Sequence, residues 1–284
     1  MTEREQKLQA AKNGDPEAQC WVAYRYLFGQ DGFPKDTESA MEWYLKAAEG
    51  GHAGAQNYIG NCYEHGIKGM PQSAGKAFEW YNNAANRGNE EAKANLFRFM
   101  DGQLEKAKGG DAEAQWFTAE LFLAGREPQK AIAWYAKAAE QGHPKGQAAM
   151  GEFYELGKHG VQQDWEKAVE WYRKAAVQGD AVAQNNLGSM LYSGRYSPAH
   201  GRVVTGGPIA EAEAYQWFSK AAGQGYILAY INLAGCYING KGVSKNRGLG
   251  EQWLQKAAAQ GHYGAKEALR KLKDNMRGEG FWKV

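Results

Sequence analysis

Few residues in this sequence have the types and spacing that catalysis would need. The nearest candidate is Gly69–Ala77 (GMPQSAGKA), which approaches the phosphate-binding pattern G-x-x-x-x-G-K-[ST]. It has five residues between the glycines where that pattern has four, and Ala77 stands where a hydroxyl would hold magnesium. The chain contains no G-x-S-x-G, H-E-x-x-H or paired C-x-x-C sequence. We therefore expect no catalytic residue and no nucleotide cofactor.

The histidines and cysteines do not form ligand sets either. His52, His143 and His262 each follow a glycine directly and have no second ligand at i+3 or i+4, so a role at a helix start is expected and a metal site is not. Cys62 and Cys236 precede a large residue at equivalent points, which indicates packing. Three scattered cysteines argue against a disulfide framework and favour a reducing compartment.

One short phrase recurs along the chain and predicts the elements that carry everything else. Within its first copy, Ala40, Trp43, Tyr44, Ala47 and Ala48 fall at i, i+3, i+4, i+7 and i+8, the spacing of an apolar stripe on an α-helix. A glycine closes each copy, where a helix favours a left-handed residue. We expect the indoles to pack between helices. The six copies are EWYLKAAEGG (42–51), EWYNNAANRG (79–88), AWYAKAAEQG (133–142), EWYRKAAVQG (170–179), QWFSKAAGQG (216–225) and QWLQKAAAQG (252–261).

The closing glycines, together with Gly14 and Gly110, mark a repeat. Their separations are 37, 37, 22, 32, 37, 46 and 36 residues. Counting onward from each glycine, small residues at +4, apolar residues at +8 and large residues at +12 predict a second helix in every repeat. A period in the thirties is typical of a stacked helical solenoid, because one helix pair cannot bury its apolar face alone.

These residues resemble the Sel-one-like repeat family, which is related to the tetratricopeptide repeats. The resemblance is clearest in AQNYIGNCYEHG (55–66) with KAFEWYNNAANRG (76–88), and in GQAAMGEFYELG (146–157) with KAVEWYRKAAVQG (167–179). It covers nearly the whole chain. It implies an all-α fold, a right-handed α-α superhelix of about seven helix-turn-helix repeats plus a C-terminal cap. Such repeats serve many unrelated partners, so the resemblance is specific for the fold and weak for function.

Departures from the period predict where the scaffold changes. We expect residues 1–284 to form a single solenoid with a degenerate repeat, and a possible bend, at about 89–110, where only 22 residues separate two glycines. Residues 195–208 (RYSPAHGRVVTGGP) form a long Gly- and Pro-rich insertion of the kind that is either mobile or used in binding. Residues 261–280 predict a basic capping helix. Phe281 and Trp282 then either fold back on that helix or are exposed for a partner.

If the fold is that of a tetratricopeptide-like array, the positions +6, +10 and +13 of each first helix face the concave groove. These residues vary where the core positions repeat, as expected when a generic scaffold carries a particular groove. We therefore predict a partner-binding surface of Tyr24, Asn57, Asn61, Glu64, Arg98, Trp116, Glu120, Glu152, Glu155, Asn185, Ser189 and Tyr192, extended by Arg195, Tyr196 and Arg202 of the insertion.

The predicted groove is acidic although the chain is nearly neutral, with 34 basic and 32 acidic residues and a net charge of +2. The negative centre consists of Glu64, Asp101, Glu120, Glu152 and Glu155, relieved mainly by Arg98. One interpretation is that a basic protein docks there, with Trp116 and Tyr192 as aromatic anchors. The other is that these carboxylates form an ordinary solvated helix face.

The leading hypothesis is a non-enzymatic scaffold that binds one protein partner in its groove, most concretely a bacterial cytoplasmic adaptor or an immunity protein that neutralises a toxin. We expect no nucleic acid, membrane or small-molecule substrate as partner, and no cofactor or metal. The sequence shows no secretory signal and no membrane span.

An enzymatic alternative also follows from the resemblance. A cysteine-rich branch of the family is linked to β-lactam binding and hydrolysis and carries K-A-C where this chain has Lys-Ala-Ala, as at 46–48, 137–139, 174–176 and 256–258. RNA binding is disfavoured because it needs a basic groove.

Overall fold

The computed structural model describes residues 2–194 and 207–274, and every regular element in those ranges is an α-helix. The predicted Arg195, Tyr196, Arg202 and Phe281–Trp282 features lie outside the described residues. The helices are α1 (Glu3–Lys12), α2 (Pro16–Phe28), α3 (Thr37–Glu49), α4 (Ala53–His65), α5 (Ala74–Asn86), α6 (Glu90–Lys108), α7 (Ala112–Ala124), α8 (Pro128–Glu140), α9 (Pro144–Leu156), α10 (Trp165–Val177), α11 (Ala181–Tyr192), α12 (Pro208–Gly223), α13 (Ile227–Asn239), α14 (Arg247–Ala259) and α15 (Tyr263–Asp274).

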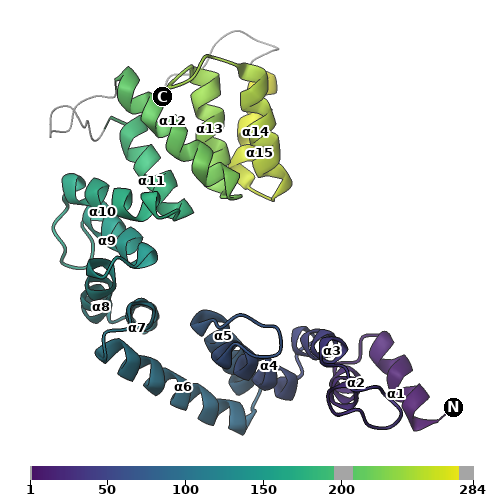
Figure 1. The fold of residues 1–284 in the computed structure, drawn as a ribbon. Helices are drawn as coiled ribbons and strands as arrows, with labels where there is room; N and C mark the ends of the chain where they lie inside the picture. The colour runs from purple at the N-terminus through teal and green to yellow at the C-terminus, as the bar shows by residue number, and fades with distance from the viewer. Residues whose placement is uncertain (1, 195–206, 275–284) are drawn as a thin grey trace. The chain divides into compact units, whose positions relative to one another are not determined.

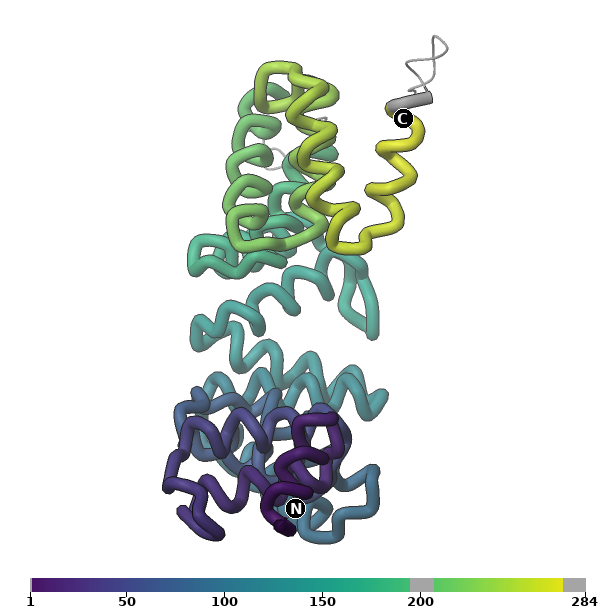
Figure 2. The backbone as a smooth tube through the Cα atoms, turned by 90° about the vertical axis from the view of Figure 1, so that its right-hand side faces the viewer, coloured from purple at the N-terminus to yellow at the C-terminus, as the bar shows by residue number. Residues whose placement is uncertain are grey.

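Consecutive helices pack as antiparallel pairs, and within α1–α6 and within α8–α15 each helix packs on the next (Figure 1). The pairs include α2 with α3, α4 with α5, α9 with α10, α11 with α12, and α13 with α14. The last helices, α12 to α15, run side by side, and α15 covers α14 as the predicted capping helix (Figure 2). The prediction of an all-α fold built from stacked helix pairs is confirmed.

The chain divides into two compact units, Met1–Thr118 (unit 1) and Ala119–Val284 (unit 2). The division falls within α7. Just before it, the degenerate repeat forms a single uninterrupted helix, α6, of 19 residues, because the sequence there supplies no second Trp-Tyr phrase. That the chain behaves as one elongated solenoid stays a prediction of the sequence.

The core is built from the residue after each repeated tryptophan. Tyr44, Tyr81, Tyr135, Tyr172 and Phe218 are all at most 5% exposed. Of the six indoles in these phrases, only Trp217 is buried, and the other five are half-buried. The indoles pack against the core as expected, although most do so only as partly buried rings: Trp43, Trp80, Trp217 and Trp253 all contact it. The phenol or phenyl ring enters the core, and the neighbouring indole lies at its edge.

Lysine side chains lie over five of the six repeated indoles, including the buried Trp217. In five repeats the ammonium group lies 4.1 to 4.5 Å from the ring centre of the tryptophan three residues earlier, a cation–π distance. The five lysines are Lys46, Lys137, Lys174, Lys220 and Lys256. Four of them head the Lys-Ala-Ala triplets named above, so these triplets have a packing role in the scaffold.

At five junctions, a buried glutamine near the start of one helix bonds to the last turn of the preceding helix. Its side-chain Nε2 donates to the carbonyl oxygen of an alanine eight residues earlier, at 2.9 to 3.2 Å, and each glutamine is at most 7% exposed. The five glutamines are Gln19, Gln56, Gln115, Gln147 and Gln184. This bond satisfies a carbonyl at a helix C-terminus, where the helix itself offers no partner.

The residues that end and begin the helices follow the sequence prediction. All eight repeat-closing glycines have φ between 85° and 97°, a conformation that residues with a Cβ rarely adopt. His52, His143 and His262 accept a hydrogen bond from the backbone N–H three residues later through Nδ1, at 3.0, 3.1 and 3.3 Å. They are therefore N-cap residues, which confirms the predicted helix-start role.

Candidate partner-binding surface

Three of the predicted groove carboxylates are held by tyrosines that cross the core. The phenol of Tyr81 donates to Glu64 Oε2 at 2.6 Å, and the phenol of Tyr135 donates to Glu120 Oε1 at 2.6 Å. The phenol of Tyr172 donates to Glu155 Oε2 at 2.8 Å. In each case the glutamate belongs to the first helix of a pair, here called the inner helix. The tyrosine belongs to the second, here called the outer helix. The scaffold thus fixes the position of these carboxylates.

Burial disfavours ionisation of the three tyrosine phenols. It raises the pKa of Tyr81, Tyr135 and Tyr172 well above the ordinary value, and the facing carboxylate raises each pKa further. Because the phenols stay protonated at neutral pH, they act as permanent donors to the glutamates. Each phenol thus fixes one carboxylate oxygen of its glutamate in place.

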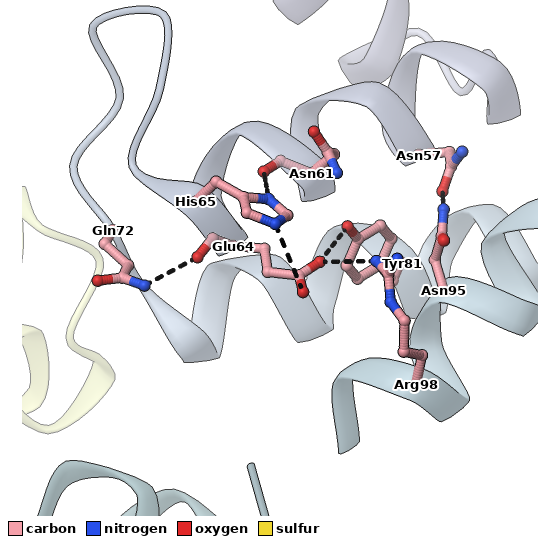
Figure 3. A network of polar contacts seen from close by, with 8 residues as sticks. All are labelled: Asn57, Asn61, Glu64, His65, Gln72, Tyr81, Asn95 and Arg98. Carbon is pink, nitrogen blue, oxygen red and sulfur yellow. Dashed lines mark hydrogen bonds and ion pairs between the residues drawn. The ribbon is translucent and has the colours of Figure 1, made fainter. Parts of the chain in front are cut away.

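In unit 1 the charge of Glu64 is largely neutralised (Figure 3). Arg98 Nη2 lies 3.3 Å from Glu64 Oε2, and His65 Nε2 lies 4.0 Å from Glu64 Oε1. The side chain of Glu64 is 18% exposed, whereas that of Arg98 is 61% exposed. This part of the predicted surface therefore presents an arginine to solvent rather than a carboxylate.

In unit 2, Glu120 and Glu152 line one cavity of about 310 Å³. Glu120 comes from α7 and Glu152 from α9, and the exposed side chains of Leu123 and Leu156 form apolar walls beside them. Glu152 makes no ion pair with any residue in the described ranges, so its charge is not compensated directly. Lys158 on the rim leaves two carboxylates against one ammonium in the cavity.

This cavity has the chemistry to receive a long basic side chain. The methylene stem of a lysine or arginine packs on apolar side chains while its charged head meets a carboxylate. Glu155 lies one turn further along α9, but its carboxylate accepts from Tyr172, and it does not line the cavity. The structure thus brings Glu120 and Glu152 together and separates Glu155 from them.

The predicted asparagines mainly join neighbouring inner helices. Asn57 is 7% exposed and accepts from Asn95 Nδ2 at 3.0 Å, and Asn185 is 4% exposed and accepts from Asn232 Nδ2 at 2.8 Å. The two links occupy equivalent places in the two units. Asn61 is half-buried, and its backbone carbonyl accepts from His65 Nδ1 at 3.0 Å.

The remaining predicted residues differ in exposure. Tyr24 is 43% exposed and stacks on Phe28, with ring centres 4.6 Å apart. Trp116 on α7 is half-buried. Ser189 is half-buried and accepts from Asn232 at 3.4 Å, and the Tyr192 hydroxyl accepts from Asn239 Nδ2 at 3.1 Å.

Sequence reasoning located the carboxylates but missed the tyrosines that hold them. The signal was present, because the bonded tyrosine lies 15 or 17 residues after its glutamate in all three cases. In these three repeats, the second residue of the Trp-Tyr phrase therefore indicates the carboxylate that the scaffold orients.

Searches for other kinds of site give little in the part of the chain that is described. No group of three or more His, Cys, Asp or Glu residues there could hold a metal ion. No helix within residues 2–194 and 207–274 has the length and apolar character of a membrane span.

Comparison with known proteins identifies the repeats. The model of the Sel1 repeat matches residues 16–52, 53–89, 112–143, 144–180, 181–226 and 227–262. Those six matches leave out the whole of α6, the helix of the degenerate repeat. None of the curated proteins compared matches the chain.

Two solved structures resemble the chain along most of its length. A protective antigen present in uropathogenic Escherichia coli strains, described as having an SLR fold, is 32% identical with a TM-score of 0.57. That similarity covers 95% of this chain and 59% of the antigen, so the chain spans well under two thirds of that protein. A Sel1 repeat protein from Oxalobacter formigenes is 28% identical with a TM-score of 0.55, over 95% of this chain and 79% of that one.

Proposed function

Because the chain belongs to the Sel1 repeat family, we propose that it is a non-enzymatic scaffold that binds a single protein partner on the inner faces of its helix pairs. The partner carries a basic surface. In its most concrete form, the proposal is a bacterial cytoplasmic adaptor or an immunity protein that neutralises a basic toxin by binding it. The three free cysteines, Cys20, Cys62 and Cys236, support the reducing compartment that this proposal assumes.

The observation that carries the proposal is the cavity formed by Glu120 and Glu152 in unit 2. Two carboxylates and the ammonium of Lys158 line the same space with His159, and Leu123 and Leu156 leave apolar surface exposed beside them. A basic side chain entering the cavity would gain both an ion pair and apolar contact.

The tyrosines support the same proposal through preorganisation. Glu120 is already held by Tyr135, so a partner would not have to order that side chain on binding. The insertion residues Arg195, Tyr196 and Arg202 remain part of the proposed surface on sequence grounds alone.

The β-lactam hydrolase alternative receives no support from the geometry. Lys46, Lys137, Lys174 and Lys256, which match the lysine of the hydrolase branch, each lie over an indole ring. The alanines that stand where that branch has cysteine pack inside the scaffold. We therefore favour the binding role.

The test is affinity capture with isosteric variants. The tagged chain, the double variant Glu120→Gln/Glu152→Gln and the control Glu140→Gln/Glu166→Gln are used to capture proteins from a bacterial lysate. Glutamine at 120 can still accept from Tyr135, so the scaffold bond is kept. The control removes two carboxylates from exposed positions on the outer helices α8 and α10.

We expect the wild type and the control to retain the same basic protein and the double variant to lose it. The purified pair should then show a dissociation constant about tenfold higher for the double variant, as is ordinary for loss of close interfacial charges. Equal retention by all three chains would place binding elsewhere and overturn the proposal. Capture of an acidic protein by the wild type would do the same.

A further inference from the structure

A second cavity, of about 550 Å³, lies at the C-terminal end of unit 2. Its walls are mostly apolar: Tyr192 comes from α11, Ile231 and Ile238 from α13, Leu254 from α14 and Leu272 from α15. It is larger than the cavity of Glu120 and Glu152 and shares no residue with it. Apolar cavities of this size with a few polar groups at one end are the usual form of a binding site.

The sequence of α13 explains why this cavity is apolar. Its three predicted groove positions are Ile231, Gly235 and Ile238, whereas α9 has Glu152 and Glu155 at two of the equivalent places. A Cβ added at Gly235 would meet nothing closer than the Tyr192 hydroxyl, at 3.8 Å. Packing therefore does not require a glycine here, and its missing side chain leaves the floor of the cavity empty.

The polar groups gather at one end of the cavity. Lys241 Nζ lies 4.7 Å from the ring centre of Tyr192 and 3.5 Å from Glu211 Oε1, and its side chain is 42% exposed. Asn239 donates to the Tyr192 hydroxyl at 3.1 Å. An ammonium has three N–H donors, and this one is partly exposed to solvent, so it can donate to a further carboxylate.

We propose that this cavity binds a large apolar side chain of a partner polypeptide, with an acidic residue next to it that pairs with Lys241. The apolar lining fits the side chain, and the ammonium at the rim fits the carboxylate. Helix α13 contacts α11, and α11 contacts α9, so both cavities lie along one row of inner helices. A protein partner that binds along this row could reach both cavities, and we therefore favour it over a free small molecule. The inference rests on the proposed function only in taking the apolar side chain and its acidic neighbour to belong to a protein partner.

The experiment uses three capped dipeptides and the full chain. The probes are acetyl-Phe-Asp-amide, acetyl-Phe-Asn-amide and acetyl-Ala-Asp-amide, and binding is followed by the amide shifts of Gly235 and Asn239 in NMR spectra. We expect acetyl-Phe-Asp-amide to saturate with a Kd of about 1 mM, an ordinary affinity for a ligand of this size. The Asn probe should bind about two- to fivefold more weakly, and the Ala probe should not saturate.

Two variants decide the assignment. Gly235→Leu fills the cavity without a backbone clash and should abolish binding of the Phe probes, while circular dichroism checks that it is folded. Lys241→Gln should remove the difference between the Asp and Asn probes, whereas Lys256→Gln, which acts on an outer-helix lysine, should preserve it. Unchanged binding in Gly235→Leu, or equal binding of the two Phe probes to the wild type, would overturn the inference.

The result is separable from the test of the acidic cavity. The Glu120→Gln/Glu152→Gln variant should bind acetyl-Phe-Asp-amide as the wild type does, because the two cavities share no residue. Loss of probe binding in that variant would contradict the assignment of the probe to the cavity at Gly235. Failure of the capture experiment alone would leave the dipeptide result unaffected.

Discussion

Replacing Gln184 by methionine should cost more stability than the same replacement at Gln56, although the two glutamines occupy equivalent places in their repeats. Gln184 Nε2 donates to the Ala176 carbonyl at 3.0 Å, and Gln184 Oε1 accepts from Gln224 Nε2 at 2.9 Å. Gln56 makes only the first kind of bond, to the Ala48 carbonyl at 2.9 Å, and its buried Oε1 has no partner.

The magnitudes follow from counting bonds. Methionine at 184 loses two hydrogen bonds of about 1 kcal/mol each, so the free energy of unfolding should fall by about 2 kcal/mol. Methionine at 56 loses one bond but also removes a buried unpaired oxygen, which itself costs about 1 kcal/mol, so the net change should be near zero. Both alanine carbonyls keep a backbone partner, from Gly179 and Gly51 respectively, and are not left orphaned.

Hydrogen exchange measured by mass spectrometry is the suitable assay, because it reports the free energy of opening in α4 and α11 separately and does not require the two units to unfold together. Methionine matches glutamine in length and branching, so cavity effects should be small in both variants. Equal losses at the two positions would refute the reasoning, since the two sites differ chiefly in the partner of Oε1.

Three further predictions concern the scaffold. In urea denaturation, Gly151→Ala should lower stability by about 1–3 kcal/mol, because its Cβ would lie 2.6 Å from Tyr172 Cδ1. Gly102→Ala, whose Cβ would meet nothing within 4 Å, should raise stability by up to about 1 kcal/mol. A gain in stability for Gly151→Ala would contradict the packing. The raised pKa of Tyr172 predicts a contribution to stability that is fully present below pH 10, the ordinary tyrosine pKa, and is lost as pH rises above it. Tyr172→Phe should make the free energy of unfolding fall less steeply between pH 9 and 11.5. An unchanged dependence on pH would count against the buried phenol. His52→Ala should cost about 1 kcal/mol in thermal unfolding through loss of the cap to the Ala55 N–H, and His52→Asn should restore most of it; equal effects of the two substitutions would exclude a capping role.

Much of the fold could be predicted because local sequence signals within each repeat set the helix ends and the buried faces. Closing glycines such as Gly51 fix helix ends, and the stripe of Tyr44 with Ala47 and Ala48 fixes the buried face. The choice between Trp43 and Tyr44 could not be predicted. Adjacent residues on a helix lie about 100° apart, and a broad apolar stripe includes both, so only packing against the neighbouring pair decides which ring is buried.

The candidate surface was less predictable because it depends on contacts between repeats. The sequence counted Glu64, Asp101, Glu120, Glu152 and Glu155 as one acidic centre, but Arg98 pairs with Glu64, and Glu155 does not line the cavity of Glu120 and Glu152. Periodicity places a residue on a face. It does not show which side chain of another helix reaches it, and that decides whether a carboxylate is available to a partner.

The most direct test of the central claim is the association rate of the captured partner, measured by stopped-flow fluorescence at low and physiological salt. For the wild type, attraction by Glu120 and Glu152 should make association fast at low salt and clearly slower at physiological salt. The Glu120→Gln/Glu152→Gln variant should associate about tenfold more slowly at low salt and lose most of that salt dependence. Rates and salt dependence equal to those of the Glu140→Gln/Glu166→Gln control would contradict the account.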